Sequence, residues 1–155
     1  MRITRFLREE LIEPNLDLTD KNQVLEHLVK LVMPCLKSQC AAEADQVLTA
    51  LREREEVTST GIGNGVAIPH AKIEGLQRMA LAFARSAAGV NFQSLDDAPV
   101  HLIFLVIAPP AVVSDYLKLL AAISAFLKKD KNRAALLKAG TKTEILAAIK
   151  AGEAL

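Results

Sequence analysis

Residues 54–70 read Arg-Glu-Glu-Val-Thr-Ser-Thr-Gly-Ile-Gly-Asn-Gly-Val-Ala-Ile-Pro-His, the most distinctive segment of the chain. The segment starts inside a charged helical run, and residues 57–60 are β-prone. Glycine then alternates with other residues at 61–65, which predicts a turn. Residues 66–68 form a short apolar strand that we expect to stop at Pro69, because proline cannot donate to a sheet ladder. The segment therefore predicts a helix, two short strands around a turn, and a histidine at the exit.

The three glycines, Gly61, Gly63 and Gly65, allow backbone N–H groups to approach an anion closely. No Gly-Lys-Ser/Thr ending follows them, so the segment is not a P-loop, and their spacing does not match the dinucleotide fingerprint. On the glycines alone, a plain tight hairpin is favoured over an anion site. A nucleotide-binding enzyme has no other support in the sequence.

Two helices are expected before this segment and two strands after it. The first helix opens at Asp20, with Gln23 placed as in a capping box, and the second ends in the charged run 52–56. Strands are expected at 79–85 and 100–107, with turn chemistry at 96–99 between them. The apolar residues of the two helices recur at helical spacing: Val24, Leu25, Leu28, Leu31 and Val32 in the first, and Ala44, Val47, Leu48 and Leu51 in the second.

The rest of the chain is predicted to be helical. Asp130 is expected to cap a short helix that ends at Gly140, and Thr141 with Glu144 forms a capping box for the last helix. The helix before them is expected to bury one face, listed as Val113, Leu117, Leu120, Ser124 and Leu127, with Leu119 and Ile123 beside it. The order of elements predicts an α/β fold with a small sheet between helical layers, mixed in direction because some strand connections are too short for crossovers.

Length and composition indicate one domain, 1–155, with a substantial core, since 51% of the residues are hydrophobic. The 19 Lys and Arg residues nearly balance 18 Asp and Glu residues, so there is no general electrostatic footprint for nucleic acid or an anionic membrane. The apolar stretch 102–113 is far shorter than the roughly 20 residues that span a bilayer. With no secretory signal in view, we expect a cytoplasmic protein that does not insert into a membrane.

Structural roles are expected for the two cysteines and for two of the three histidines. Cys35 and Cys40 lack zinc-site spacing and are expected to be reduced, partly buried thiols, so no metal site is predicted. His27 is expected to be a half-exposed histidine at the border of its helix stripe. His101, at the start of a strand, is expected to find a backbone partner.

His70 is the candidate nucleophile. A neutral imidazole keeps one ring nitrogen free to attack phosphorus while the other is held by a hydrogen bond, and phosphoryl transfer then needs mainly positioning and positive charge. Arg54 can supply a bidentate guanidinium, although the residues alone favour its being one more solvated charge in the run 52–56. Further donors near the phosphate are expected from the turn, namely Ser59, Thr60, Gly61, Gly63 and Asn64.

The whole motif resembles the signature of the mannitol/fructose class of enzyme IIA domains of the sugar phosphotransferase system, and most of all the free-standing nitrogen-regulatory type. The resemblance extends to Leu16-Asp17-Leu18, to the turn at 96–100 and to the strand that ends in Ala108-Pro109. It implies a mannitol-type IIA fold, three layers α/β/α around a small mixed sheet. It also implies that His70 carries the phosphoryl group with Arg54 at the site, that the donor is an HPr-like phosphocarrier, and that no metal or organic cofactor takes part.

One position departs from this pattern. The family usually has a second active-site histidine at the start of a His-Leu-x-x-Leu helix, and here that segment begins at Tyr116. A tyrosine can donate its O–H to a phosphoryl oxygen but cannot carry positive charge. Whether Tyr116 neighbours the phosphate or merely packs on its helix is left open by the sequence.

The resemblance leaves the downstream role open. A nitrogen-regulatory protein would control partners through its phosphorylation state, and the partners in the family include potassium-transport and sensor-kinase systems. The alternative with the same chemistry is a fructose- or mannitol-specific IIA that passes phosphate to a IIB subunit. The altered second histidine also keeps a different class in view, a binding module that is not phosphorylated.

Overall fold

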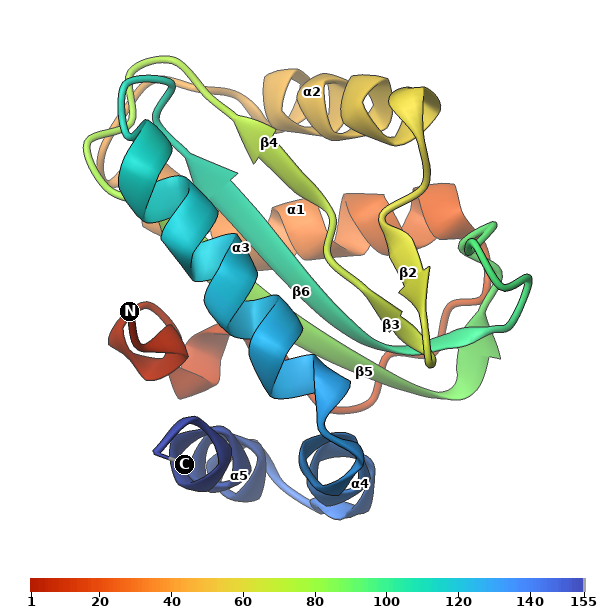
Figure 1. Ribbon diagram of the computed structural model, residues 1–155. Coiled ribbons are helices and arrows are strands. Elements are labelled where there is room, and N and C mark those ends of the chain that lie inside the picture. Colours follow the sequence, from red (N-terminus) through yellow and green to blue (C-terminus); the bar gives the residue numbers. More distant parts are fainter. Residues whose placement is uncertain (155) are drawn as a thin grey trace.

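The computed structural model describes residues 1–154, and its centre is a mixed sheet built on two long antiparallel strands, β5 (Ala80–Val90) and β6 (Val100–Ala108) (Figure 1). The sheet order is β1-β5-β6-β3-β2, and β4 also pairs with β6. The short strands are β1 (Ile12–Glu13), β2 (Gly61–Gly63), β3 (Val66–Ala67) and β4 (His70–Lys72). The β1–β5, β3–β6 and β4–β6 pairs are parallel, and the β2–β3 and β5–β6 pairs are antiparallel, which confirms the expected mixed sheet.

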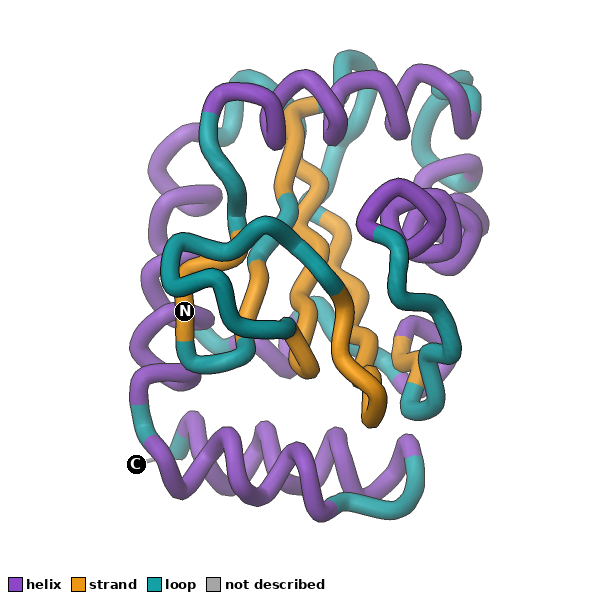
Figure 2. The backbone as a smooth tube through the Cα atoms, turned by 90° about the vertical axis from the view of Figure 1, so that its right-hand side faces the viewer, coloured by secondary structure: helices purple, strands orange, loops and turns teal. Residues whose placement is uncertain are grey.

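Helices cover both faces of this sheet. The purple helices lie on either side of the orange strands in Figure 2, with α1 (Lys21–Lys37) packed against β5 and α3 (Val113–Lys128) against β6. Helix α2 (Ala44–Val57) packs on α1 and on β4, while α4 (Asp130–Lys138) and α5 (Lys142–Glu153) pack together at the far end (Figure 1). The three-layer α/β/α prediction is confirmed.

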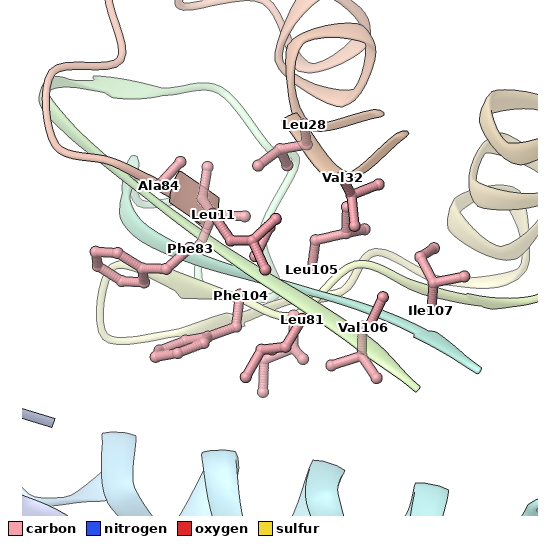
Figure 3. Packing of buried hydrophobic residues seen from close by; sticks show 14 of the residues in the cluster. Leu11, Leu28, Val32, Leu81, Phe83, Ala84, Phe104, Leu105, Val106 and Ile107 are labelled. Carbon is pink, nitrogen blue, oxygen red and sulfur yellow. The ribbon is translucent and has the colours of Figure 1, made fainter. Parts of the chain in front are cut away.

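The core is divided between the two faces of the sheet by strand alternation. Figure 3 shows Leu105 and Ile107 of β6 on the side of α1, and Phe104 and Val106 on the opposite side, toward the C-terminal helices. All four side chains are fully buried. Burial on both faces explains why the β6 sequence is almost continuously apolar.

The two ends of the chain are tied together. Two short 3₁₀ helices, η1 (Ile3–Arg5) and η2 (Glu9–Leu11), open the chain and pack against α5. The carboxylate of Glu153, at the end of α5, accepts hydrogen bonds from the backbone N–H of Ile3 (2.7 Å) and from the Thr4 hydroxyl. These bonds satisfy donors at a helix start that no local side chain caps.

Most helix starts follow the sequence prediction. The Asp20 carboxylate accepts from the Gln23 N–H (3.1 Å), and the Thr141 hydroxyl accepts from the Glu144 N–H (3.1 Å). The prediction for Asp130 was wrong: this residue is the first of α4 rather than its cap, and α4 ends at Lys138 before Gly140. Helix α3 ends at Lys128 and α4 begins at Asp130, so the single residue between them, Lys129, caps both helices.

The buried face of α3 was predicted correctly only in part. Val113 is 51% exposed and Leu117 is 60% exposed. The buried residues of α3 are Leu119, Ile123 and Leu127, which the prediction included, and Tyr116 and Phe126, which it left out. Because α3 is apolar on two adjacent faces, helical periodicity alone does not tell which of them meets the sheet.

The segment that carries the motif differs from its prediction in three places. Helix α2 continues to Val57, so residues 58–60 are a loop rather than a strand. Residues 61–63 are strand β2 rather than turn, and the turn is confined to Asn64 and Gly65, which have φ angles of 58° and 74°. The chain resumes pairing with β6 directly after Pro69, because the Pro69 carbonyl accepts from the Val106 N–H (3.0 Å) although the proline has no donor.

Within residues 1–154, every helix is too short or too polar to span a bilayer. In the same residues, no group of three or more His, Cys, Asp or Glu side chains is arranged to hold a metal ion.

Candidate functional site

His70 is the first residue of β4, and a backbone carbonyl holds one nitrogen of its ring. Its Nδ1 lies 2.7 Å from the Ile68 carbonyl oxygen. A carbonyl only accepts hydrogen bonds, so Nδ1 carries the proton and the neutral ring keeps its lone pair on Nε2. The sequence Ile-Pro-His thus supplies the acceptor that selects the tautomer two residues before the imidazole.

Arg54 faces the free nitrogen of this ring. It lies in the last turn of α2, which packs on β4, and its Nε donates to His70 Nε2 at 3.1 Å. Its Nη1 donates to the Thr58 carbonyl at 2.9 Å, which fixes the plane of the guanidinium. The helix and the strand therefore bring together two residues that are sixteen positions apart.

Burial sets the charge of His70. Desolvation lowers the pKa of His70 from its ordinary value of 6.5, and the positive charge of Arg54 lowers it further. The hydrogen bond to Ile68 and the negative charge of Glu55 act in the opposite direction without reversing the shift. His70 is therefore neutral near pH 7, which is the state that can act as a nucleophile.

The ring of Tyr116 contacts the imidazole of His70. The two ring centroids are 5.9 Å apart, with an interplanar angle of 69°, an edge-to-face contact. Burial raises the pKa of Tyr116 to about 12, and the charge of Arg54 only partly offsets this. The hydroxyl therefore stays protonated and neutral. Tyr116 is buried, with 5% of its surface exposed, and its ring contacts the imidazole of His70.

The other predicted donors bond to groups of the protein itself. The Ser59 hydroxyl donates to the Phe92 carbonyl (2.8 Å) and accepts from the Gly61 N–H (3.1 Å). The Thr60 N–H and hydroxyl both donate to Glu55, and the Asn64 N–H donates to the Asp96 carboxylate (3.2 Å). Gly63 adopts a φ of 98°, which suits a residue without a Cβ. Arg54, His70 and Tyr116 therefore meet, and the remaining members of the set shape the loop beside them.

Two residues of this region were missed by sequence reasoning. The sequence places Glu55 in a charged run, yet its side chain is only 5% exposed and forms an ion pair with Lys21 at 2.7 Å. Lys21 also donates to the Phe92 carbonyl (3.3 Å) and lies 4.9 Å from the centre of the Phe92 ring. The sequence could have predicted the burial of Glu55, because Glu55 follows the buried Leu51 by four residues and so lies on the same helix face.

Lys72 was also missed. It lies two residues after His70 on β4, and its Nζ is 5.6 Å from the centre of the Tyr116 ring. Because the strand was predicted to stop at Pro69, the sequence offered no reason to place the two side chains on one face.

The remaining histidines and cysteines have the roles that were expected. His101 Nδ1 lies 2.8 Å from the Ser86 carbonyl oxygen, the backbone partner that was predicted. The His27 side chain is 37% exposed and contacts Glu13 at 3.0 Å. Cys35 and Cys40 are free and partly buried.

The fold and the site together define a small α/β domain that presents one neutral, nucleophilic imidazole beside a guanidinium. The chain belongs to the family described as phosphoenolpyruvate-dependent sugar phosphotransferase system, EIIA 2, whose model matches residues 5–152. The family resemblance read from the motif is thereby confirmed.

Relatives of both functional branches are similar to this chain. The chain is 36% identical over 128 residues to a nitrogen regulatory protein of Bradyrhizobium diazoefficiens, covering 83% of this chain and 81% of that protein. It is 34% identical over 146 residues to the fructose-specific EIIABC component of Bacillus subtilis, covering 94% of this chain but only 22% of that longer protein.

A solved structure supports the fold. The crystal structure of the nitrogen regulatory protein IIA-Ntr from Neisseria meningitidis superimposes with a TM-score of 0.87 at 26% identity. The match covers 95% of this chain and 98% of that one. The enzyme IIA fold implied by the motif is confirmed over nearly the whole chain.

Proposed function

We propose that this chain is a phosphocarrier that accepts a phosphoryl group on Nε2 of His70 from the phosphohistidine of an HPr-like protein. The observation that carries the proposal is the arrangement of the imidazole: Nδ1 is held by the Ile68 carbonyl and Nε2 faces the Arg54 guanidinium. One nitrogen is therefore protonated and fixed, and the other has a lone pair directed at a cation that suits phosphoryl oxygens.

The transfer follows from these contacts. The lone pair of Nε2 forms the new P–N bond while the P–N bond of the donor breaks, and the electron pair of that bond returns to the donor imidazole. Nδ1 keeps its proton, so His70 becomes positively charged as it takes the phosphoryl group. The Ile68 carbonyl, which accepts from Nδ1–H, stabilises that charge.

Arg54 must change partners during this step. In the structure its Nε occupies the lone pair of Nε2, at 3.1 Å, so it has to move from the nitrogen to the phosphoryl oxygens as the group arrives. Its bond to the Thr58 carbonyl keeps the guanidinium close during the exchange. We assign the Tyr116 hydroxyl as a neutral donor to the phosphoryl group, and the Ser59–Asn64 loop as the support that positions the strand.

The same proposal covers the downstream role. The similarity to nitrogen regulatory proteins, which covers most of both chains, favours a regulator whose phosphorylation state is read by partner proteins. Transfer to a IIB subunit is the second candidate, favoured by the similarity to a fructose-specific component. Incubating the phosphorylated chain with a IIB subunit separates the two, since only a sugar-specific protein would lose its phosphate to it rapidly.

The deciding experiment is phosphoryl transfer from a phosphorylated HPr-type carrier, followed by intact mass. Wild type should gain one acid-labile phosphate, His70→Ala should gain none, and Arg54→Gln should react on the order of 10²-fold more slowly, as when one preorganised donor is lost. Tyr116→His reports what the tyrosine contributes. A wild type that binds the carrier yet takes no phosphate would refute the phosphocarrier and leave the binding module.

A further inference from the structure

The pairing register of β4 places a second cation beside His70. In the parallel ladder with β6, His70 pairs with Val106 and Lys72 with Ala108. Laterally paired residues point to the same face of a sheet, and Val106 points to the face opposite α1 (Figure 3). Residues 70 and 72 therefore project together toward α3, while Ala71 between them is buried on the other face.

Tyr116 of α3 contacts both of these side chains. Its ring centre is 5.9 Å from the centre of the His70 ring and 5.6 Å from the Lys72 Nζ. The tyrosine is buried between them and cannot ionise near pH 7, since burial raises its pKa to about 12. It therefore serves as a neutral surface that holds the ammonium group close to the imidazole.

The charge balance of the site leaves a role for this ammonium group. A phosphoryl group carries about 1.5 to 2 negative charges near pH 7 on three acceptor oxygens. Arg54 supplies one cationic donor for these oxygens, whereas the positive charge of the phosphorylated imidazole is directed through Nδ1–H at the Ile68 carbonyl. Within residues 1–154, Lys72 has no carboxylate at ion-pair distance, and its side chain is exposed. Its contact with the Tyr116 ring is weak and easily exchanged for a phosphoryl oxygen.

We propose that Lys72 is a second phosphoryl-binding residue, which rests on the Tyr116 ring in the free protein and pairs with the phosphoryl oxygens once His70 is phosphorylated. This inference rests on the proposed function. Arg54 then holds the group from the side of α2 and Lys72 from along β4, so two cations on different elements neutralise it. Lys72 makes and breaks no covalent bond in this role.

The test compares Lys72→Met, Lys72→Arg and the control Lys118→Met, which removes a lysine from an exposed position on the same helix as Tyr116. Each protein is equilibrated with a phosphorylated HPr-type carrier, and the distribution of phosphate between the two is measured by intact mass. Lys72→Met should shift this equilibrium toward the carrier roughly tenfold, the effect of one charge-assisted hydrogen bond. Lys72→Arg should restore most of it, and Lys118→Met should stay within twofold of wild type.

The kinetics separate this role from docking of the carrier. If Lys72 binds the phosphoryl group, Lys72→Met lowers the maximal transfer rate and leaves KM for the carrier within twofold. A Lys72→Met protein with wild-type equilibrium, or with a raised KM as its only change, overturns the inference. If the wild-type protein takes up no phosphate from the carrier, the proposed function itself is refuted, and this outcome is distinct from the two above.

Discussion

Replacing Lys21 with methionine is expected to destabilise the protein by about 2–3 kcal/mol. Lys21 neutralises the Glu55 carboxylate, whose side chain is 5% exposed, across a distance of 2.7 Å. Removing one member of a buried ion pair typically costs about 3–5 kcal/mol, because the other charge is left without compensation. We expect less here, since Glu55 keeps its hydrogen bonds from the Thr60 N–H and hydroxyl, and since Lys21 itself is 15% exposed.

A double-mutant cycle isolates the charge. In a Glu55→Gln background, position 55 carries no negative charge, so adding Lys21→Met should lower the free energy of unfolding by less than about 1 kcal/mol. The matched control is Arg52→Met, which breaks the ion pair between Arg52 and Glu26, whose side chains are 42% and 51% exposed. Exposed pairs contribute about 0–1 kcal/mol, so this variant should be nearly as stable as wild type.

Urea unfolding followed by far-UV circular dichroism measures these differences, and a thermal scan should show Lys21→Met melting roughly 4–12 °C lower. The reasoning is refuted if Lys21→Met costs no more than Arg52→Met. It is refuted equally if the cost of Lys21→Met is the same with glutamate and with glutamine at position 55, because the effect would then come from packing and not from the buried charge.

Three further predictions concern other parts of the molecule. NMR titration should place the pKa of His70 below 6.5, and Arg54→Gln should raise that pKa. As pH falls, the imidazole of wild type is protonated in the unfolded chain before it is protonated in the folded chain, so the free energy of unfolding should decrease below about pH 6.5. Arg85→Met, which removes the donors to the backbone carbonyls of Pro14 (3.1 Å), Leu136 (2.9 Å) and Ala139, should cost about 2–3 kcal/mol in urea unfolding, and a cost below about 1 would contradict this. Gly152→Ala should cost about 1–3 kcal/mol, because its Cβ would lie 2.4 Å from a phenylalanine ring, whereas Gly140→Ala, with a nearest atom at 3.4 Å, should stay within about 0.5 kcal/mol.

Local signals predicted local structure well. The Asp20 and Thr141 caps and the apolar strand at 100–107 depend on residues within a few positions of one another, and all are present. The turn predicted at 61–65 is present in its second part, at Asn64 and Gly65. The errors began where a choice depended on distant partners. Residues after Pro69 pair with β6 because that strand offers a free edge, which nothing in the neighbouring sequence reveals.

The candidate site shows the same division. The spacing from Arg54 to His70 and the Ile-Pro-His sequence were readable from the chain, and they indicated Arg54 and His70 as the proposed site. The burial of Glu55, the use of Thr60 as its donor, and the approach of Lys72 to Tyr116 were not, because each arises where two separate elements pack together. Propensity and spacing act over one turn or one hairpin, whereas burial and charge pairing are set by whichever element arrives from elsewhere in the chain. The sequence therefore indicated His70 as the proposed nucleophile, and the surroundings that lower the pKa of His70 emerged only when α2, β4 and α3 met.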